Sequence, residues 1–427
     1  MKPTFEHEKR ALALALVFST TLAVFGASPV SAEEQASGMP GDWLSQYLGP
    51  RPAGIGGAFV AVADDPIGVV WNPAGLSFMS QNQMSAETSR LFESTTINAL
   101  SIAVPGRKLP SFGLTILNLR SGEFQKTNEL NEPLGEFSES NMAFLFSISK
   151  NVTPRFSLGV NAKVVRHSLD EFDAAGVGAD IGALYQILPT LRVGASVLNL
   201  GGPTINMRSI DETYPAEFRG GLSFFFLGGR GLVSAELDHR SGPGTSFLGG
   251  TEFWVHRTTA LRLGYAGSEP SGGLSVYVSP DFRLDYAAVD HELGVVHSFA
   301  LSYRFGGFFA SSRAVPEVFS PLGQQSVTKF QLAAKTKSNA QSWSLDIVDK
   351  SNQVVRRFSG KGLPPAHVMW DGKDETGLPL PDGVYAYQLV VVDEEGARFE
   401  AHRRSVEITT EGPRGVVPII TEMNDHS

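Results

Sequence analysis

The sequence predicts an all-β protein: an antiparallel transmembrane β-barrel of about fourteen strands, preceded by an N-terminal plug segment and followed by a small β-sandwich. Two observations predict the barrel. Residues 83–305 repeat a pattern in which apolar residues occupy every second position, as in strands with one apolar and one polar face. The connections between these segments alternate between short and longer ones, as in barrels that span a membrane.

Composition limits the classes of protein that fit. The chain has 427 residues, which is more than one ordinary domain. Only 19% of the residues are charged, whereas 45 are Gly and 28 are Phe, a mixture that favours short strands and turns over long helices. The net charge of −9 argues against a nucleic-acid partner, because such binding requires clustered basic residues.

Residues 1–32 have the pattern of a secretory signal peptide. Three basic side chains precede the apolar run 11–25, and Val-Ser-Ala at 30–32 supplies the small residues that signal peptidase accepts. An uncleaved anchor helix is the alternative, but the run is short for a bilayer. The chain has no cysteine, which excludes a lipoprotein anchor and a disulfide framework. We therefore expect an exported protein.

The barrel strands are recognised by their alternation. In the fifth segment, Leu158, Val160 and Val164 share one face, whereas Ser157 and Asn161 share the other. A soluble sandwich alternates in the same way, so the pattern alone does not decide between the two. The segments are 83–91, 96–105, 111–120, 139–149, 155–167, 176–187, 190–198, 216–226, 231–239, 246–256, 259–267, 272–279, 281–288 and 297–305.

The connections favour the barrel. Every even-numbered connection is a turn of a few residues, whereas the odd-numbered ones include the long polar stretches Ser121–Ser138 and Asn199–Pro215 and the acidic stretch Ser168–Ala175. Short turns at one rim and longer loops at the other are typical of outer-membrane barrels. An even number of strands then brings both ends of the barrel to the periplasmic side.

Residues 33–82 precede the strands and are rich in Gly, Pro and Ala. Within them, residues 49–76 resemble the N-terminal signature of the PorV/PorQ family, which is related to FadL-type channels for hydrophobic substrates. The resemblance extends over about 43–305 and implies that this segment forms a plug inside a fourteen-stranded barrel. Read as a dinucleotide-binding loop, the glycines have the wrong spacing. The candidate plug residues are Gly54, Gly56, Gly57, Asp64, Asp65, Trp71, Asn72 and Pro73.

A second β unit, 326–409, follows a linker at 306–325 and precedes a polar tail at 410–427. It is similar to the Ig-like domain of the flagellar hook-capping protein FlgD, on the residues of 343–349, 368–372, Gly377 and 380–385. Asp371–Asp382 weakly matches a calcium loop, but Thr376 occupies the position that requires glycine, so a structural turn is favoured. We expect Trp370 to lie in the core.

Charged residues on the face opposite the apolar stripe are expected to line the lumen. Alternation in the tenth and eleventh segments sets Phe253 opposite Leu261, and therefore Glu252 opposite Arg262. We expect Asp64 or Asp65 of the plug to meet Arg283 or Arg304. The full set of candidate lumenal charges is Arg192, Glu252, Arg262, Arg283, Asp285 and Arg304.

No catalytic motif, cofactor loop or metal-ligand spacing occurs, so the sequence predicts that the protein is not an enzyme. The resemblance implies an outer-membrane scaffold or shuttle for secretion partners or cargo, with plug and Ig-like domain on the periplasmic side. An uptake channel for apolar small solutes is the first alternative, and a soluble secreted adhesin is the second. The expected partners are outer-membrane lipid and envelope proteins that bind the Ig-like domain.

Overall fold

The computed structural model describes residues 40–44, 46–92, 94–106, 109–207, 210–241, 244–323 and 326–410. The predicted signal peptide, the first residues of the predicted plug segment (33–39) and residues 411–427 of the predicted tail lie outside this described part. The chain divides into two compact units, with the boundary between Gly306 and Gly307.

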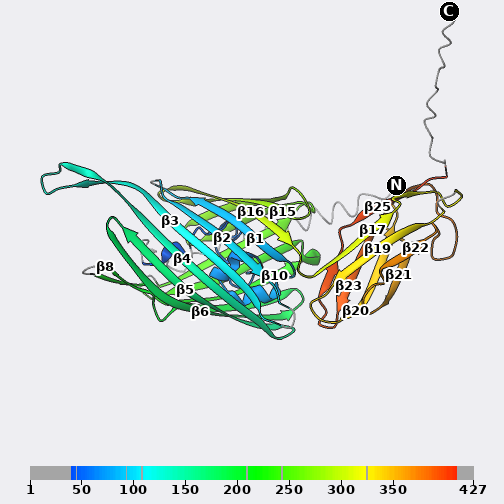
Figure 1. Cartoon of the computed structure of the whole chain (residues 1–427), viewed down its shortest axis with the longest axis horizontal. Coiled ribbons are helices and arrows are strands. Elements are labelled where there is room, and N and C mark those ends of the chain that lie inside the picture. Colours follow the sequence, from blue (N-terminus) through cyan, green and yellow to red (C-terminus); the bar gives the residue numbers. More distant parts are fainter. Residues whose placement is uncertain are drawn as a thin grey trace, which may run out of the picture. The chain divides into compact units, whose positions relative to one another are not determined.

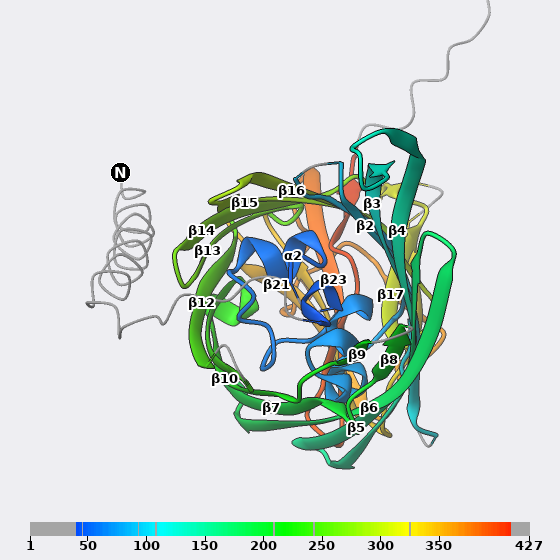
Figure 2. The same cartoon turned by 90° about the vertical axis from the view of Figure 1, so that its left-hand side faces the viewer.

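The first unit is a closed antiparallel barrel (Figures 1 and 2). Within the described residues, fourteen strands pair in sequence order, and β1 closes the ring on β16 from Asn82↔Phe305 to Arg90↔His297. The strands are β1 Asn82–Arg90, β2 Thr96–Val104, β3 Ser111–Thr127, β4 Pro133–Thr153, β5 Phe156–Leu169, β6 Phe172–Leu188, β7 Leu191–Leu200, β10 Glu217–Phe226, β11 Gly231–Arg240, β12 Gly244–Trp254, β13 Thr259–Ala266, β14 Glu269–Tyr277, β15 Phe282–His291 and β16 Gly294–Phe305. The fold class predicted from the sequence is confirmed.

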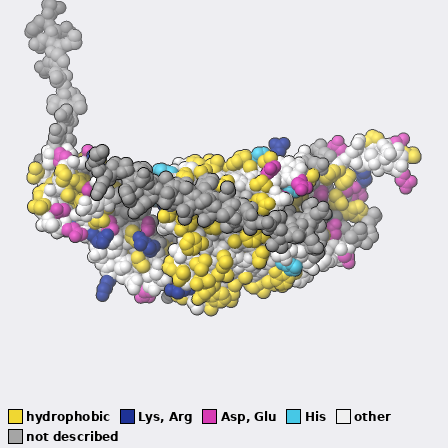
Figure 3. Space-filling view, turned by 180° about the vertical axis from the view of Figure 1, so that it is seen from behind, with side chains coloured by type: hydrophobic (Ala, Val, Ile, Leu, Met, Phe, Trp, Pro, Cys, Tyr) yellow, Lys and Arg dark blue, Asp and Glu magenta, His cyan; other side chains and the backbone are white. Residues whose placement is uncertain are grey.

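Alternation along each strand separates an outward apolar face from an inward polar one. In β5, Leu158, Val160 and Val164 are exposed, whereas Ser157 and Asn161 are buried. Apolar side chains gather on the side of the barrel that Figure 3 shows. This excludes a soluble sandwich for residues 82–305, because a sandwich would bury these stripes between two sheets.

The predicted long loops are mostly strand. Much of Ser121–Ser138 extends the β3–β4 hairpin, and β5 and β6 together take up nearly all of Ser168–Ala175. The stretch 199–215 carries a small hairpin of its own, β8 (Thr204–Met207) with β9 (Ile210–Thr213). The prediction was wrong there because polar residues continue the backbone ladder beyond the apolar stripe, where no periodicity marks the strand.

We call the described residues 40–80 the plug. It contains η1 (Asp42–Leu44), α2 (Pro50–Gly54), η2 (Pro66–Val70) and η3 (Pro73–Phe78). Asp65 and Asn72 cap η2 and η3, since their side-chain oxygens accept the amides of Gly68 at 3.0 Å and Ala74 at 3.1 Å. No helix among the described residues is long and apolar enough to cross a membrane.

The plug crosses the lumen from one rim to the other. We call the rim at which β2, β4, β6, β10, β12 and β14 end the turn rim, and the opposite one the hairpin rim. Asp42 contacts Arg240 at the end of β11, so the described plug begins near the hairpin rim. Ala74 contacts Ser157 at the start of β5, so the plug ends near the turn rim. The described plug therefore spans the lumen and is not confined to one rim.

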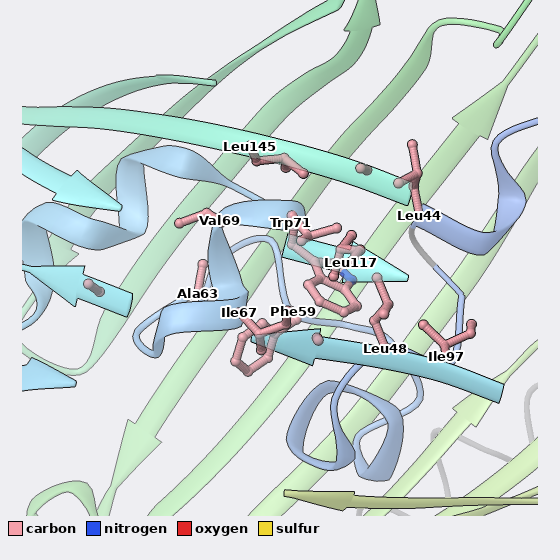
Figure 4. Packing of buried hydrophobic residues seen from close by; sticks show 14 of the residues in the cluster. Leu44, Leu48, Phe59, Ala63, Ile67, Val69, Trp71, Ile97, Leu117 and Leu145 are labelled. Carbon is pink, nitrogen blue, oxygen red and sulfur yellow. The ribbon is translucent and has the colours of Figure 1, made fainter. Parts of the chain in front are cut away.

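Apolar side chains of the plug form one core with the barrel wall (Figure 4). Phe59 and Trp71 of the plug pack edge to face at 5.7 Å, and both are at most 2% exposed. Ile97, Leu117 and Leu145 of the wall belong to the same cluster. The interior is therefore a packed core, with the plug as its centre.

The second unit is a β-sandwich with its own core. One sheet has the order β17 (Phe309–Val315), β19 (Thr328–Lys335), β22 (His367–Trp370). The other has the order β18 (Val318–Phe319), β25 (Arg404–Ile408), β23 (Gly383–Asp393), β20 (Ala340–Val348), β21 (Val354–Lys361), with β24 (Arg398–Glu400) on β23. Trp370 is 1% exposed, which confirms its predicted place in the core.

The predicted linker 306–325 is wrong as a linker. Residues 309–315 form β17, which pairs with β19 from Phe309↔Lys335 to Val315↔Lys329. Phe308 and Phe319 are buried in the core of this unit. The two prolines and the weak periodicity of a short edge strand hid it from the sequence analysis. The predicted turn is correct: Asp374 Oδ1 accepts the amides of Thr376 and Leu378.

Candidate functional site: the contact between plug and barrel wall

Arg51 lies at the centre of the largest charged cluster between plug and wall. It sits on α2, and its guanidinium contacts the carboxylates of Asp64 and Asp65 within the plug, the latter at 3.4 Å. On the other side it reaches the wall, where Nε donates to Glu252 Oε2 at 2.9 Å and Nη2 to Oε1 at 3.3 Å. Because two hydrogen bonds join the two side chains, they fix the orientation of the guanidinium relative to the carboxylate as well as the distance between them.

The cluster continues along the wall from Glu252. Arg262 Nε donates to Glu252 Oε2 at 2.7 Å, and the Arg262 side chain is 0% exposed. Its Nη2 lies 3.2 Å from Asp285, which in turn accepts from Arg283 Nε at 2.7 Å. Charges removed from water in this way are stable only when each has partners, and here the partners come from β12, β13, β15 and the plug.

A second charged cluster holds the middle of the plug. Val60 N donates to Glu236 Oε2 at 2.7 Å, so a wall carboxylate accepts directly from the plug backbone. Glu236 also pairs with Arg219 at 3.2 Å, and Arg219 contacts Glu217 and, at 3.5 Å, Asp238. All four wall residues are buried.

Neutral wall side chains bind the plug backbone along its length. Ser196 donates to Trp71 O at 2.7 Å, Ser223 to Ala61 O at 3.0 Å and Asn161 to Val69 O at 2.9 Å. One side chain of the plug also takes part: Asn72 Nδ2 donates to Val60 O within the plug and to Ala183 O of the wall. These bonds satisfy backbone groups that the irregular plug cannot pair internally.

Glycines of the wall allow the plug to approach the strands. A Cβ at Gly194 would collide with the Val60 carbonyl, and one at Gly264 would collide with the Gly56 amide. A Cβ at Gly159 would meet the backbone of Pro73 and Ala74. The absence of side chains at these positions lets the plug backbone lie directly against the strands of the wall.

The candidate plug residues all lie inside this interface. Gly56 and Gly57 have φ of 64° and 74°, which only glycine adopts without strain, and Gly56 packs on the backbone of Tyr265. Gly54 packs on the side chain of Arg262. The remaining members, Asp64, Asp65, Trp71, Asn72 and Pro73, make the contacts described above.

The predicted wall charges divide into two groups. Glu252 faces Arg262 in the register, and the ion pair predicted from alternation is present. Arg192 Nη1 donates to the plug carbonyl of Val62 at 3.1 Å. Arg304, in contrast, bonds Pro280 O at 2.7 Å and lies over the ring of Tyr277 at the turn rim.

The ion-pair partner of Asp64 and Asp65 is Arg51 of the plug itself, which the sequence analysis did not name. Among the described residues, neither carboxylate forms an ion pair with Arg283 or Arg304, although Asp65 and Arg283 line the same small cavity. One signal in the sequence could have identified this partner: Arg51 is the only Lys or Arg between residues 40 and 82. The second cluster also had a signal, since Glu217 and Arg219 alternate on β10 as Glu236 and Asp238 do on β11.

One side of the lumen is apolar. Ile97, Leu117, Leu119, Leu145 and Val165 of β2–β5 form it, and they share a cluster with Leu44 and Leu48 from the start of the plug. Two small cavities between plug and wall each have room for about one water molecule. Among the described residues, no group of three or more His, Asp or Glu side chains is arranged to hold a metal ion.

Comparison with known proteins assigns the C-terminal unit. The family model of the FlgD Ig-like domain matches residues 319–395, so the chain carries an FlgD Ig-like domain at its C-terminal end. Comparison with curated protein sequences gives no match.

Among solved structures, the barrel is similar to the toluene transporter TodX of Pseudomonas putida, with 14% identity over 59% of this chain and 96% of that one and a TM-score of 0.47. It is also similar to a FadL homologue of Pseudomonas aeruginosa, with 12% identity over 60% of this chain and 98% of that one and a TM-score of 0.44. The KdgM porin gives 8% identity, 52% and 99% coverage and a TM-score of 0.30. The barrel fold of this chain is defined by its own strand pairing.

Proposed function

We propose that the chain is a PorV-like outer-membrane scaffold: a barrel closed by a resident plug, which holds an Ig-like module at the membrane surface for envelope or secretion partners. The observation that carries this proposal is the attachment of the plug. The ion pair of Arg51 with Glu252, the hydrogen bond from Val60 N to Glu236 and a glycine-lined wall hold the plug on several sides. A lumen filled in this way suits a scaffold better than an open pore.

Insertion into a membrane is supported by the outer face. Large apolar side chains with exposures of 40–51% recur on strands all around the ring, for example Phe144, Leu222, Leu261 and Phe299. A continuous apolar surface of this extent is rare on soluble monomers. A closed barrel also leaves no strand edge unpaired within the lipid.

Orientation follows from the rims and is part of the proposal. Outer-membrane barrels turn their short connections toward the periplasm. The Ig-like unit begins at Gly307, directly after β16 reaches the turn rim, and so belongs on the periplasmic side. The described plug begins near the hairpin rim, which would face outward in this orientation.

The absence of cysteine from the sequence makes this orientation testable. Leu130→Cys at the tip of the β3–β4 hairpin is expected to react with a membrane-impermeant maleimide in intact cells. Arg257→Cys at the turn rim and Leu378→Cys in the Ig-like unit are expected to react only after the cells are permeabilised. All three side chains are exposed. The reverse labelling pattern would contradict the proposed orientation.

Conductance tests the closed lumen. The purified full-length protein, inserted in planar bilayers, is expected to show no stable open-channel steps. Steps of regular size in the wild type would contradict a resident plug. A pull-down from solubilised membranes, with the full chain and with a chain ending at Gly306, then tests the second half of the proposal, because partners of the Ig-like unit should be lost on truncation.

An uptake channel for apolar solutes is the second candidate. The apolar side of the lumen favours it, because Leu117, Leu119 and Leu145 would line a path if residues 42–48 moved away. Removing the side chains that hold this part of the plug, for example by Asp42→Ala and Tyr47→Phe, should then speed entry of an apolar solute into cells. Tyr47 OH donates to Glu269 at 2.9 Å, and Asp42 pairs with Arg240 at 2.9 Å. Unchanged entry would leave the scaffold as the better account.

A further inference from the structure

The two rims of the barrel carry opposite charge. At the turn rim, the described residues present four exposed cations, Lys150, Arg155, Arg230 and Arg257, against one exposed acidic residue, Asp281. Lys150 belongs to the outward face of β4, in line with the exposed Phe144 and Phe146. This cation therefore projects toward the surroundings of the barrel.

The hairpin rim is acidic. Its exposed cations are Arg90, Arg120, Lys126 and Arg166. Two of them are paired with an aspartate, Lys126 with Asp170 and Arg166 with Asp173. Seven further exposed acidic residues of the described part of this rim outnumber Arg90 and Arg120, so the rim keeps a net negative charge. These acidic residues are Glu129, Glu132, Glu136, Glu171, Asp211, Asp290 and Glu292. An anionic surface is therefore attracted by the turn rim and repelled by the hairpin rim.

An aromatic belt adjoins the basic rim. Ring pairs lie on the outward face near the strand ends, either between neighbouring strands, such as Phe282 with Tyr303 at 4.6 Å, or within one strand. Others are Phe112–Phe146, Phe156–Tyr185, Phe224–Phe226, Phe226–Phe253 and Tyr303–Phe305. Aromatic belts of barrels lie at the level where hydrocarbon meets headgroups.

The cations are placed next to this belt. Arg230 lies over the Phe253 ring, with Cζ 5.8 Å from its centroid, and its Nη2 donates to Trp254 O at 2.9 Å. Arg155 and Arg257 lie in the adjoining turns, and both are exposed. With the belt at the hydrocarbon boundary, these charges reach the depth of lipid phosphates. Juxtamembrane Lys and Arg attract anionic lipids at this range.

We propose that the turn rim binds the phosphate groups of anionic phospholipid headgroups in the leaflet that it faces. The proposal rests on membrane insertion, which belongs to the proposed function above. Its partner is a lipid surface, selected by complementary charge, and the acidic hairpin rim reinforces the selection by disfavouring anionic headgroups at the other leaflet. The barrel would thereby concentrate anionic lipid around one rim.

Spin-labelled lipids test this inference. The full-length protein is reconstituted in phosphatidylcholine bilayers, and the association of labelled phosphatidylglycerol is compared with that of labelled phosphatidylcholine. We expect a preference for phosphatidylglycerol of about fivefold, which falls at high salt because the contacts are screened. The variant Lys150→Gln/Arg155→Gln/Arg257→Gln should remove most of the preference. Arg230 is left unchanged because it also bonds the backbone.

A matched control changes charge at the other rim. Lys126→Gln with Arg166→Gln removes two exposed cations of the hairpin rim and should leave the lipid preference unchanged. Equal association of both lipids with the wild type would overturn the inference while leaving the scaffold proposal intact, and so would a preference that survives in the turn-rim variant. Failure of the wild type to insert in the bilayer would overturn the proposed function, and this inference with it.

Discussion

Arg51 and Glu252 are 201 residues apart in the sequence, yet Arg51 Nε donates to Glu252 Oε2 at 2.9 Å. The first belongs to the plug and the second to strand β12. Their side chains are 11% and 5% exposed, so the contact is mostly removed from water. The pair joins the irregular segment to the regular wall, and it links the two acidic residues of the plug to the arginines of the wall.

Arg51→Met is expected to destabilise the protein strongly. The change leaves Asp65 and Glu252 buried with fewer cationic partners, and breaking a buried pair by removing one member costs about 3–5 kcal/mol. The midpoint of unfolding, followed by heat-modifiable gel migration or by circular dichroism in detergent, measures the loss. Arg166→Met is the control, because its pair with Asp173 is exposed and should contribute less than about 1 kcal/mol. Similar losses in the two variants would mean that the Arg51 contacts do not hold the plug.

Gly194→Ala is expected to displace the plug without unfolding the barrel. The new Cβ would collide with the Val60 carbonyl, and overpacking of this kind costs about 1–3 kcal/mol. We expect channel steps to appear in planar bilayers where the wild type gives none. Gly220→Ala on β10 is the control, because nothing lies within 4 Å of a Cβ there. A silent Gly194→Ala channel with wild-type stability would mean that the plug does not depend on this contact.

Contacts within one hairpin could be predicted from the sequence, whereas contacts between segments that no hairpin joins could not. The pair of Glu252 and Arg262 could be predicted because both belong to one hairpin, and strand period two leaves a single register that keeps Arg262 away from lipid. No such rule connects Arg51 to Glu252, since the plug has no regular period. Strand β17 was missed for a related reason: its partner β19 lies beyond a proline-containing stretch, so no hairpin signal marks the pair.

The boundary between the two units can be tested by fragments. A fragment that begins at Gly307 keeps β17, which pairs along its length with β19, and Phe319, whose ring lies 5.5 Å from that of Trp370. It should fold and unfold cooperatively. A fragment that begins at Ser326 loses both and should be unfolded or aggregate, because Phe330 and Trp370 lose their cover. Equal cooperativity of the two fragments, measured by thermal circular dichroism, would contradict the boundary at Gly306.

Lys337 should make the stability of the Ig-like unit depend on alkaline pH. Burial lowers the pKa of its ammonium group from 10.5 to about 8, and the nearby carboxylates Glu395 and Asp393 only partly oppose this. Below pH 8 the lysine is charged in both the folded and the unfolded state, so the full cost of burying the charge is present. Between pH 8 and 10.5 the folded state releases this proton while the unfolded state keeps it. The contribution of Lys337 to the free energy of unfolding therefore rises with pH, by about 3 kcal/mol over the whole range. Lys337→Met removes the effect, so the free energy of unfolding of wild type minus variant, from denaturant titrations at pH 7 to 10.5, should increase with pH. A difference that stays constant across this range would show that Lys337 keeps an ordinary pKa in the folded unit.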